Sequence, residues 1–203
     1  MDGPARPTRP HGIVAVAVGG DGLSGAMVQL SCAASQAARA VPVLEFADLL
    51  AEQVRLRDPR DLEELARQDW IAGGPSAGWA LRRCADEVGA ALAVERMARF
   101  ELTRGWVHGW TSPEGDGAVL LAARSEGRAP RARVALSMLA AQIHEERAWE
   151  VVVGDDGPHE VFDPLAVVDR PWRLDATRTV QSELARLLGG PWSLTGYAAF
   201  RAS

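Results

Sequence analysis

Six consecutive apolar residues, Ile13-Val14-Ala15-Val16-Ala17-Val18, are followed at once by two glycines. A run of this kind, rich in β-branched residues, is typical of a strand buried on both faces of a sheet. Further apolar runs occur at 41–46, 118–123 and 149–153, and stretches with helical character lie at 24–40, 61–68, 76–100, 131–147 and 173–188. This alternation predicts an α/β fold, with a mainly parallel central sheet and helices on both of its faces.

The length of the chain favours one domain. Its 203 residues suffice for one substantial core and are few for two. We find neither an internal repeat nor a low-complexity linker. The segment 1–11 is rich in proline and arginine and lacks the apolar stretch of a signal peptide, so we expect a flexible lead-in before a single domain over 12–203.

Charge and composition exclude several functions. All 22 basic residues are arginine, and without lysine the chain can hold neither a P-loop lysine nor a pyridoxal phosphate Schiff base. The net charge of −5 and the scattered arginines give no reason to expect a nucleic-acid partner. No apolar run approaches the ~18 residues that a membrane span needs, so we expect a cytoplasmic protein with no membrane partner.

The cysteines and histidines do not indicate a metal site. Cys32 and Cys84 are expected as small buried residues in a reducing compartment, and neither belongs to a C-x-x-C motif. The four histidines lack the spacing of zinc ligands. We therefore expect no metal and no cofactor.

The first glycine turn allows three interpretations. Residues 20–25, Gly-Asp-Gly-Leu-Ser-Gly, fit G-x-G-x-x-G, and Glu45 follows about 20 residues later, as in a Rossmann-like nucleotide-binding unit. Residues 19–22 also resemble the G-G-D-G of lipid and NAD kinases, although Leu23 stands where those families usually have threonine. In the third interpretation, the turn donates backbone N–H groups to an oxyanion.

A second motif, Gly74-Pro75-Ser76-Ala77-Gly78, fits G-x-S-x-G. In a nucleophile elbow, flanking glycines allow a sharp turn from a strand into a helix that exposes the serine hydroxyl above the sheet. Here the apolar run 70–72 would be the entering strand, and the predicted helix over 76–100 would follow. The alternative is that Ser76 is only the N-cap of that helix.

With these motifs, residues 12 to about 188 resemble the α/β-hydrolase superfamily, in particular its small lidless esterases, lipases and acyl thioesterases. The order Ser76, Glu126, His159 is the serine, acid, histidine order of that fold. The resemblance implies a serine hydrolase or acyltransferase that acts on a small-molecule or carrier-bound ester or thioester. Ser76 would attack, His159 would act as base and then as acid, and Glu126 would hold the imidazole, with Asp155 or Asp156 as alternatives. Backbone N–H groups of Ala77 and of Gly20 or Asp21 would form the oxyanion hole.

Two further possibilities stay open. The chain could be a catalytically silent α/β binding or interaction module, and residues 124–129 loosely fit the R-x-x-G-x-A of acetyltransferase loops. His108 alternates with Trp106 and Trp110, which places the three side chains on one face of a strand as either a packed aromatic face or a wall that contacts a ligand.

Overall fold

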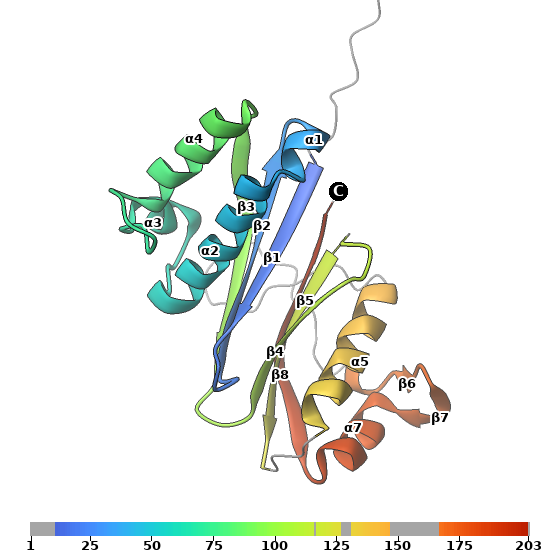
Figure 1. Ribbon diagram of the computed structural model, residues 1–203. Helices are drawn as coiled ribbons and strands as arrows, with labels where there is room; N and C mark the ends of the chain where they lie inside the picture. The colour runs from blue at the N-terminus through green and yellow to red at the C-terminus, as the bar shows by residue number, and fades with distance from the viewer. Residues whose placement is uncertain (1–10, 116, 127–130, 147–166, 203) are drawn as a thin grey trace, which may run out of the picture.

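Two three-stranded antiparallel sheets form the centre of the protein (Figure 1), in a computed structural model that describes residues 11–115, 117–126, 131–146 and 167–202. The first sheet has the order β1 (His11–Val18), β2 (Ser24–Cys32), β3 (Leu92–Glu101). The second has the order β4 (Trp106–Thr111), β5 (Gly117–Ser125), β8 (Trp192–Arg201). A small third sheet pairs β6 (Pro171–Trp172) with β7 (Asp175–Thr179). Since every one of these pairings is antiparallel, the prediction of a mainly parallel, α/β-hydrolase-like sheet is wrong.

Helices cover the outer face of each large sheet, so the layers follow the order helix, sheet, sheet, helix (Figure 1). On the first sheet lie α1 (Ser35–Ala38), α2 (Val41–Arg57), α3 (Leu62–Arg67) and α4 (Ala77–Val88). On the second lie α5 (Ala132–Glu145) and α7 (Val180–Leu188). Each helical layer shares a core with its own sheet.

A third core lies between the two sheets and joins the halves of the molecule. It includes Met27 of β2, Leu120 of β5 and Phe200 of β8. The backbones approach closely there, because a Cβ placed on Gly25 of β2 would lie 2.6 Å from Val107 Cγ1 of β4. The sheets therefore stack face to face.

The two halves repeat one supersecondary unit, although no internal repeat is evident in the sequence. In each, a hairpin is followed by helices and then by a third strand that pairs with the second strand of the hairpin. The registers correspond: β2 pairs with β3 through a bulge between Gln29 and Leu30, and β5 pairs with β8 through a bulge between Ala122 and Ala123. Bulge and register coincide when residues 24–32 are superposed on 117–125.

The helices before the third strands correspond as well. Ser76 caps the start of α4, and Thr179 caps the start of α7, each by accepting a hydrogen bond from the backbone N–H three residues on. Gly89 and Gly189 end these helices in the left-handed conformation, at φ 64° and 75°. Glycine adopts this conformation without a Cβ penalty, which explains why both helices stop there.

One segment predicted to be helical forms a strand, and one segment predicted to be a strand forms a helix. Residues 24–32 form β2 rather than a helix, because Ala26 and Val28 face the helices while Met27 faces the second sheet. Both faces of β2 are therefore apolar, so its sequence lacks the alternation of apolar and polar residues that indicates a half-exposed strand. Its residues also favour helix by propensity. Conversely, residues 41–46 begin α2, where Pro42 suits the first turn.

Other predictions agree with the structure or fall outside it. Residues 70–72 form a turn rather than a strand, and residues 92–100 of the predicted helix 76–100 belong to β3. The strands at 13–18 and 118–123 and the helices within 61–68 and 131–147 are confirmed. The predicted strand at 149–153 and the segment 1–10 of the predicted lead-in lie outside the described residues.

Candidate functional site

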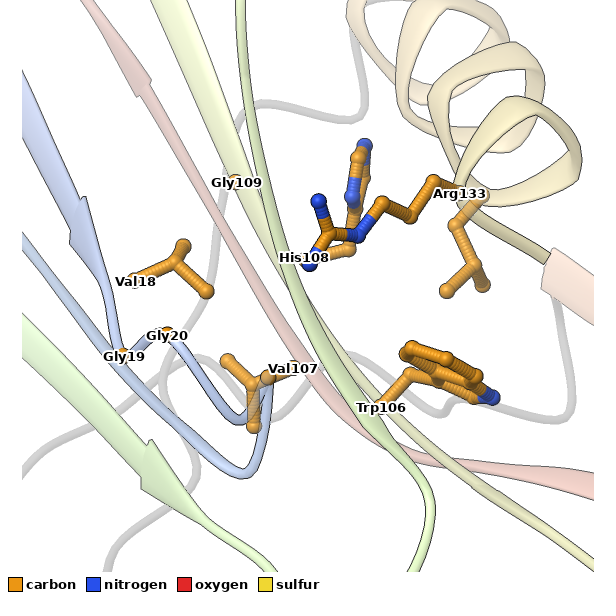
Figure 2. A pocket seen from close by; sticks show the side chains of 10 residues that line it. Val18, Gly19, Gly20, Trp106, Val107, His108, Gly109 and Arg133 are labelled. Atoms are coloured by element: carbon orange, nitrogen blue, oxygen red, sulfur yellow. The ribbon is translucent and has the colours of Figure 1, made fainter. Parts of the chain in front are cut away.

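A cavity of about 320 Å³ opens where the β1–β2 turn meets β4 and the first turns of α5. Its walls are Val18, Gly19, Gly20, Gly22, Trp106, Val107, His108, Gly109, Arg133 and Leu136. Figure 2 shows the turn residues on one side of this cavity, with Trp106 and the Arg133 side chain on the other. Each half of the molecule contributes a wall, since β1 belongs to the first half and β4 and α5 belong to the second.

The β1–β2 turn is fixed against β4 by its backbone. Gly22 adopts φ 69°, and its carbonyl accepts a hydrogen bond of 2.7 Å from the backbone N–H of Val107. The Asp21 carboxylate accepts the N–H of Leu23 at 2.9 Å, which closes the turn on itself. A Cβ on Gly22 would lie 3.5 Å from the Trp106 ring, an ordinary contact distance, so it is the positive φ rather than lack of space that favours glycine here.

His108 is the titratable group of the cavity wall. It extends from β4 toward α5, and its Nε2 lies 2.9 Å from Ser137 Oγ. Burial, and in second place the Arg133 cation, lower the pKa of His108 below its ordinary value. The lowered pKa favours the neutral imidazole, and since Nε2 faces Ser137, Nδ1 is the ring nitrogen that this contact leaves unused.

Positive charge gathers on the same side of the cavity. Arg133 is exposed and forms no ion pair with any other described residue. It sits in the first turn of α5, whose N-cap Arg131 makes no side-chain capping hydrogen bond. The N-terminus of a helix carries a partial positive charge, which adds to that of the guanidinium.

The predicted oxyanion loop lies at this cavity but not in the expected type of turn. Gly20 is one of its walls, and Asp21 belongs to the same turn. The turn joins two antiparallel strands, whereas the dinucleotide fingerprint requires a turn from a strand into a helix. Gly25 lies within β2 and Glu45 within α2, so the Rossmann-like arrangement of Gly20, Gly22, Gly25 and Glu45 is absent.

Ser76 and Ala77 lie elsewhere, at the start of α4. The Ser76 hydroxyl accepts the backbone N–H of Trp79 at 3.2 Å. The Ala77 N–H, predicted to serve an oxyanion, donates to the Gln68 carbonyl at 2.9 Å. Both groups thus have structural partners, and the preceding residues 70–75 do not form the strand of an elbow.

Glu126 is an exposed residue that follows β5 in the second half. Its carbonyl accepts a hydrogen bond of 3.2 Å from Arg104, and it lines a shallow hollow beside Trp192. Ser76 belongs to the helical layer of the first half, so the structure does not place these two predicted triad members on one element or in one cavity. His159 lies outside the described residues, and its predicted role stays a prediction.

The sequence pattern indicates part of this site and misses the rest. The alternation of Trp106, His108 and Trp110 does place them on one face, with both indoles packed against the core under α5. Ser137 and Arg133 have no signal of their own, because their approach to His108 depends on how α5 crosses β4.

The chain matches no protein-family model and no curated protein. Within the described ranges, no helix is both long and apolar enough to cross a membrane. Over the same part of the chain, no three His, Cys, Asp or Glu side chains are grouped so that they could hold a metal ion.

Proposed function

We propose that the protein binds a small anionic ligand, a carboxylate or phosphate attached to an apolar body, in the cavity between the β1–β2 turn and α5. The observation that carries this proposal is that the Arg133 guanidinium and the half-buried His108 imidazole, whose pKa is lowered, line the same cavity. An arginine with no carboxylate partner among the described residues is suited to an anion, because the guanidinium presents several donors in a fixed plane.

The chemistry of His108 supports an anion rather than a cation. When the Ser137 hydroxyl donates to Nε2, the proton of the neutral ring resides on Nδ1, which then donates to a ligand. The remaining walls, Val18, Val107, Leu136 and Trp106, suit an apolar body. A volume of about 320 Å³ is at the lower end of the range for small-molecule sites.

Acyl transfer is the rival function. Ser137 and His108 are within hydrogen-bond distance, as a nucleophile and its base must be, but Ser137 does not line the cavity. The sequence-based nucleophile, Ser76, already caps α4. The contacts of the described residues therefore favour binding over catalysis.

Benzoate and its uncharged counterpart benzamide provide the test. We expect benzoate to raise the midpoint of thermal unfolding of the full chain, since a ligand that binds only the folded state stabilises it. Arg133→Gln should abolish the effect, while Arg131→Gln, which removes a neighbouring arginine outside the cavity wall, should retain it. Equal responses to benzoate and benzamide, or equal losses in the two variants, would refute the proposal.

A fluorophosphonate probe distinguishes the rival function, acyl transfer by a serine, from anion binding. Covalent labelling that disappears in Ser76→Ala would support the hydrolase predicted from the sequence, and labelling that disappears in Ser137→Ala would support a catalytic pair with His108. We expect neither serine to be labelled.

A further inference from the structure

A second hollow, unrelated to the proposed anion site, lies between α2 and α4 on the outer face of the first sheet. It has a volume of about 290 Å³. Its walls are Pro42, Glu45, Phe46, Leu49, Trp70, Ala72, Gly73, Trp79, Ala80, Arg83, Cys84 and Glu87. We call this hollow the α2–α4 groove.

Aromatic rings dominate the groove. Phe46 and Trp70 stack with their centroids 5.3 Å apart and their planes at 26°. Trp79 packs over the backbone of Gly74, where a Cβ would lie 2.8 Å from the indole. The Arg83 guanidinium covers the Trp79 ring at 5.4 Å. Rings fixed in this way form the kind of surface that holds proline-rich peptides.

The rim of the groove is acidic. Glu45 on α2 and Glu87 on α4 are exposed, and neither forms an ion pair with another described residue. Arg83 is the one cation among the walls, and it is stacked on Trp79. The two carboxylates are therefore left for positive charges on an occupant.

The chain itself carries a matching segment. Residues 4–10 read Pro-Ala-Arg-Pro-Thr-Arg-Pro, with prolines at every third position and arginines repeating at the same interval. In a polyproline II helix, three residues make one turn of about 9 Å, so the prolines would share one edge and the arginines another. Along α2, the walls extend from Pro42 to Leu49, a rise of about 10 Å. One such turn therefore fits the groove.

The start of β1 brings this segment to the correct end of the molecule. His11, which follows Pro10, pairs with Cys32 at the end of β2. Cys32 shares a core cluster with Cys84 of the groove, and the N–H of Ala33 donates to the carbonyl of Ala91, just beyond α4, at 3.0 Å. Each residue of extended chain spans up to about 3.5 Å, so a chain of this length lets residues 4–7 reach points up to about 14–25 Å from His11.

We infer that residues 4–10 dock in the α2–α4 groove of their own chain, with prolines against Trp70 and Trp79 and with Arg6 and Arg9 toward Glu45 and Glu87. The docked segment would cover an aromatic surface between the two helices. It would also shield Cys84, which lines the groove and is 6% exposed.

The reactivity of Cys84 reports this docking in the full chain. Maleimide modification is followed by mass spectrometry, with the fully buried Cys32 as an internal control for general opening of the fold. Replacing Pro4, Pro7 and Pro10 together with alanine should accelerate modification of Cys84 severalfold. If Cys84 reacts only in molecules whose segment is undocked, the largest possible acceleration is one divided by the undocked fraction of the original protein. Thr8→Ala is the matched control and should leave the rate unchanged.

Charge reversal and a synthetic peptide complete the experiment. Arg6→Glu with Arg9→Glu should also accelerate modification, and adding Glu45→Arg with Glu87→Arg should restore protection. In the triple proline variant, an excess of the peptide of residues 1–10 should slow the reaction again. Equal rates in all variants, parallel acceleration at Cys32, or protection that depends on protein concentration would overturn the inference, the last in favour of docking between copies.

Discussion

Gly25 lies on β2 where the two sheets touch, and its replacement by alanine tests their stacking directly. The new Cβ would lie 2.6 Å from Val107 Cγ1 and 3.1 Å from Leu120 Cδ1, both on the second sheet. Carbon atoms in van der Waals contact are about 3.5–4.0 Å apart, so the sheets or these side chains must move. Overpacking of this kind costs about 1–3 kcal/mol.

The same substitution also has a favourable term. Alanine restricts the unfolded chain and thereby stabilises the folded state by about 0.4–1 kcal/mol. We therefore expect Gly25→Ala to lower the free energy of unfolding by about 1–2 kcal/mol, and the melting temperature by roughly 2–8 °C for a chain of this size. Equilibrium unfolding in urea, followed by circular dichroism, measures the first quantity.

Two comparisons isolate the steric cause. Gly190→Ala introduces a Cβ that meets no atom within 4 Å, so it keeps only the favourable term. Removing Val107 Cγ1 by Val107→Ala should reduce the penalty of Gly25→Ala, giving a coupling of at least about 0.5 kcal/mol between the two sites. If Gly25→Ala is as harmless as Gly190→Ala, or if the two penalties simply add, the described packing of the sheets is refuted.

Three further predictions concern the caps and the cavity. Ser76→Ala and Thr179→Ala should each reduce stability by about 1 kcal/mol in urea unfolding, because each removes an N-cap; a loss at neither site would contradict the capping geometry. Folding lowers the pKa of His108, so the contribution of this residue to stability is complete above about pH 6.5 and is lost as the pH falls through the folded pKa. Between about pH 8 and pH 5, the midpoint of unfolding should therefore decline less in His108→Gln than in the original protein. Arg133→Gln should raise the pKa of His108, measured by NMR titration, and an unchanged value would show that the cation is too distant to act.

Local patterns predict some elements of this fold well, since their signals are complete within a few residues. The helix predicted over 61–68 begins where Asp61 caps α3, with its carboxylate accepting the N–H of Glu64 at 2.7 Å. The apolar strand 118–123 is buried on both faces, as its composition indicates. Such features do not depend on which segments pair.

The pairing of strands is what local patterns do not determine. The turn after Val18 could lead into a helix or back along a second strand, and the Ala-, Met- and Gln-rich residues after it favour helix by propensity. Burial between a helical layer and a second sheet overrides that propensity in β2. Gly89 does carry a stop signal within the predicted helix 76–100, and its left-handed conformation separates α4 from β3.

The candidate cavity lies at a place where the two repeated halves differ in sequence. Superposing the β1–β2 register on that of β4–β5 aligns three helix-facing positions of each first strand: Ile13, Ala15 and Ala17 with Trp106, His108 and Trp110. Ala15, which occupies the position equivalent to His108, is buried among apolar neighbours. The repeated fold therefore forms with alanine at this position and does not require a histidine. Partial burial of an imidazole beside an arginine opposes its protonation, a cost that the alanine of the other half does not carry. A costly polar group that the symmetric framework does not need is better explained by what it contacts in the cavity than by stability.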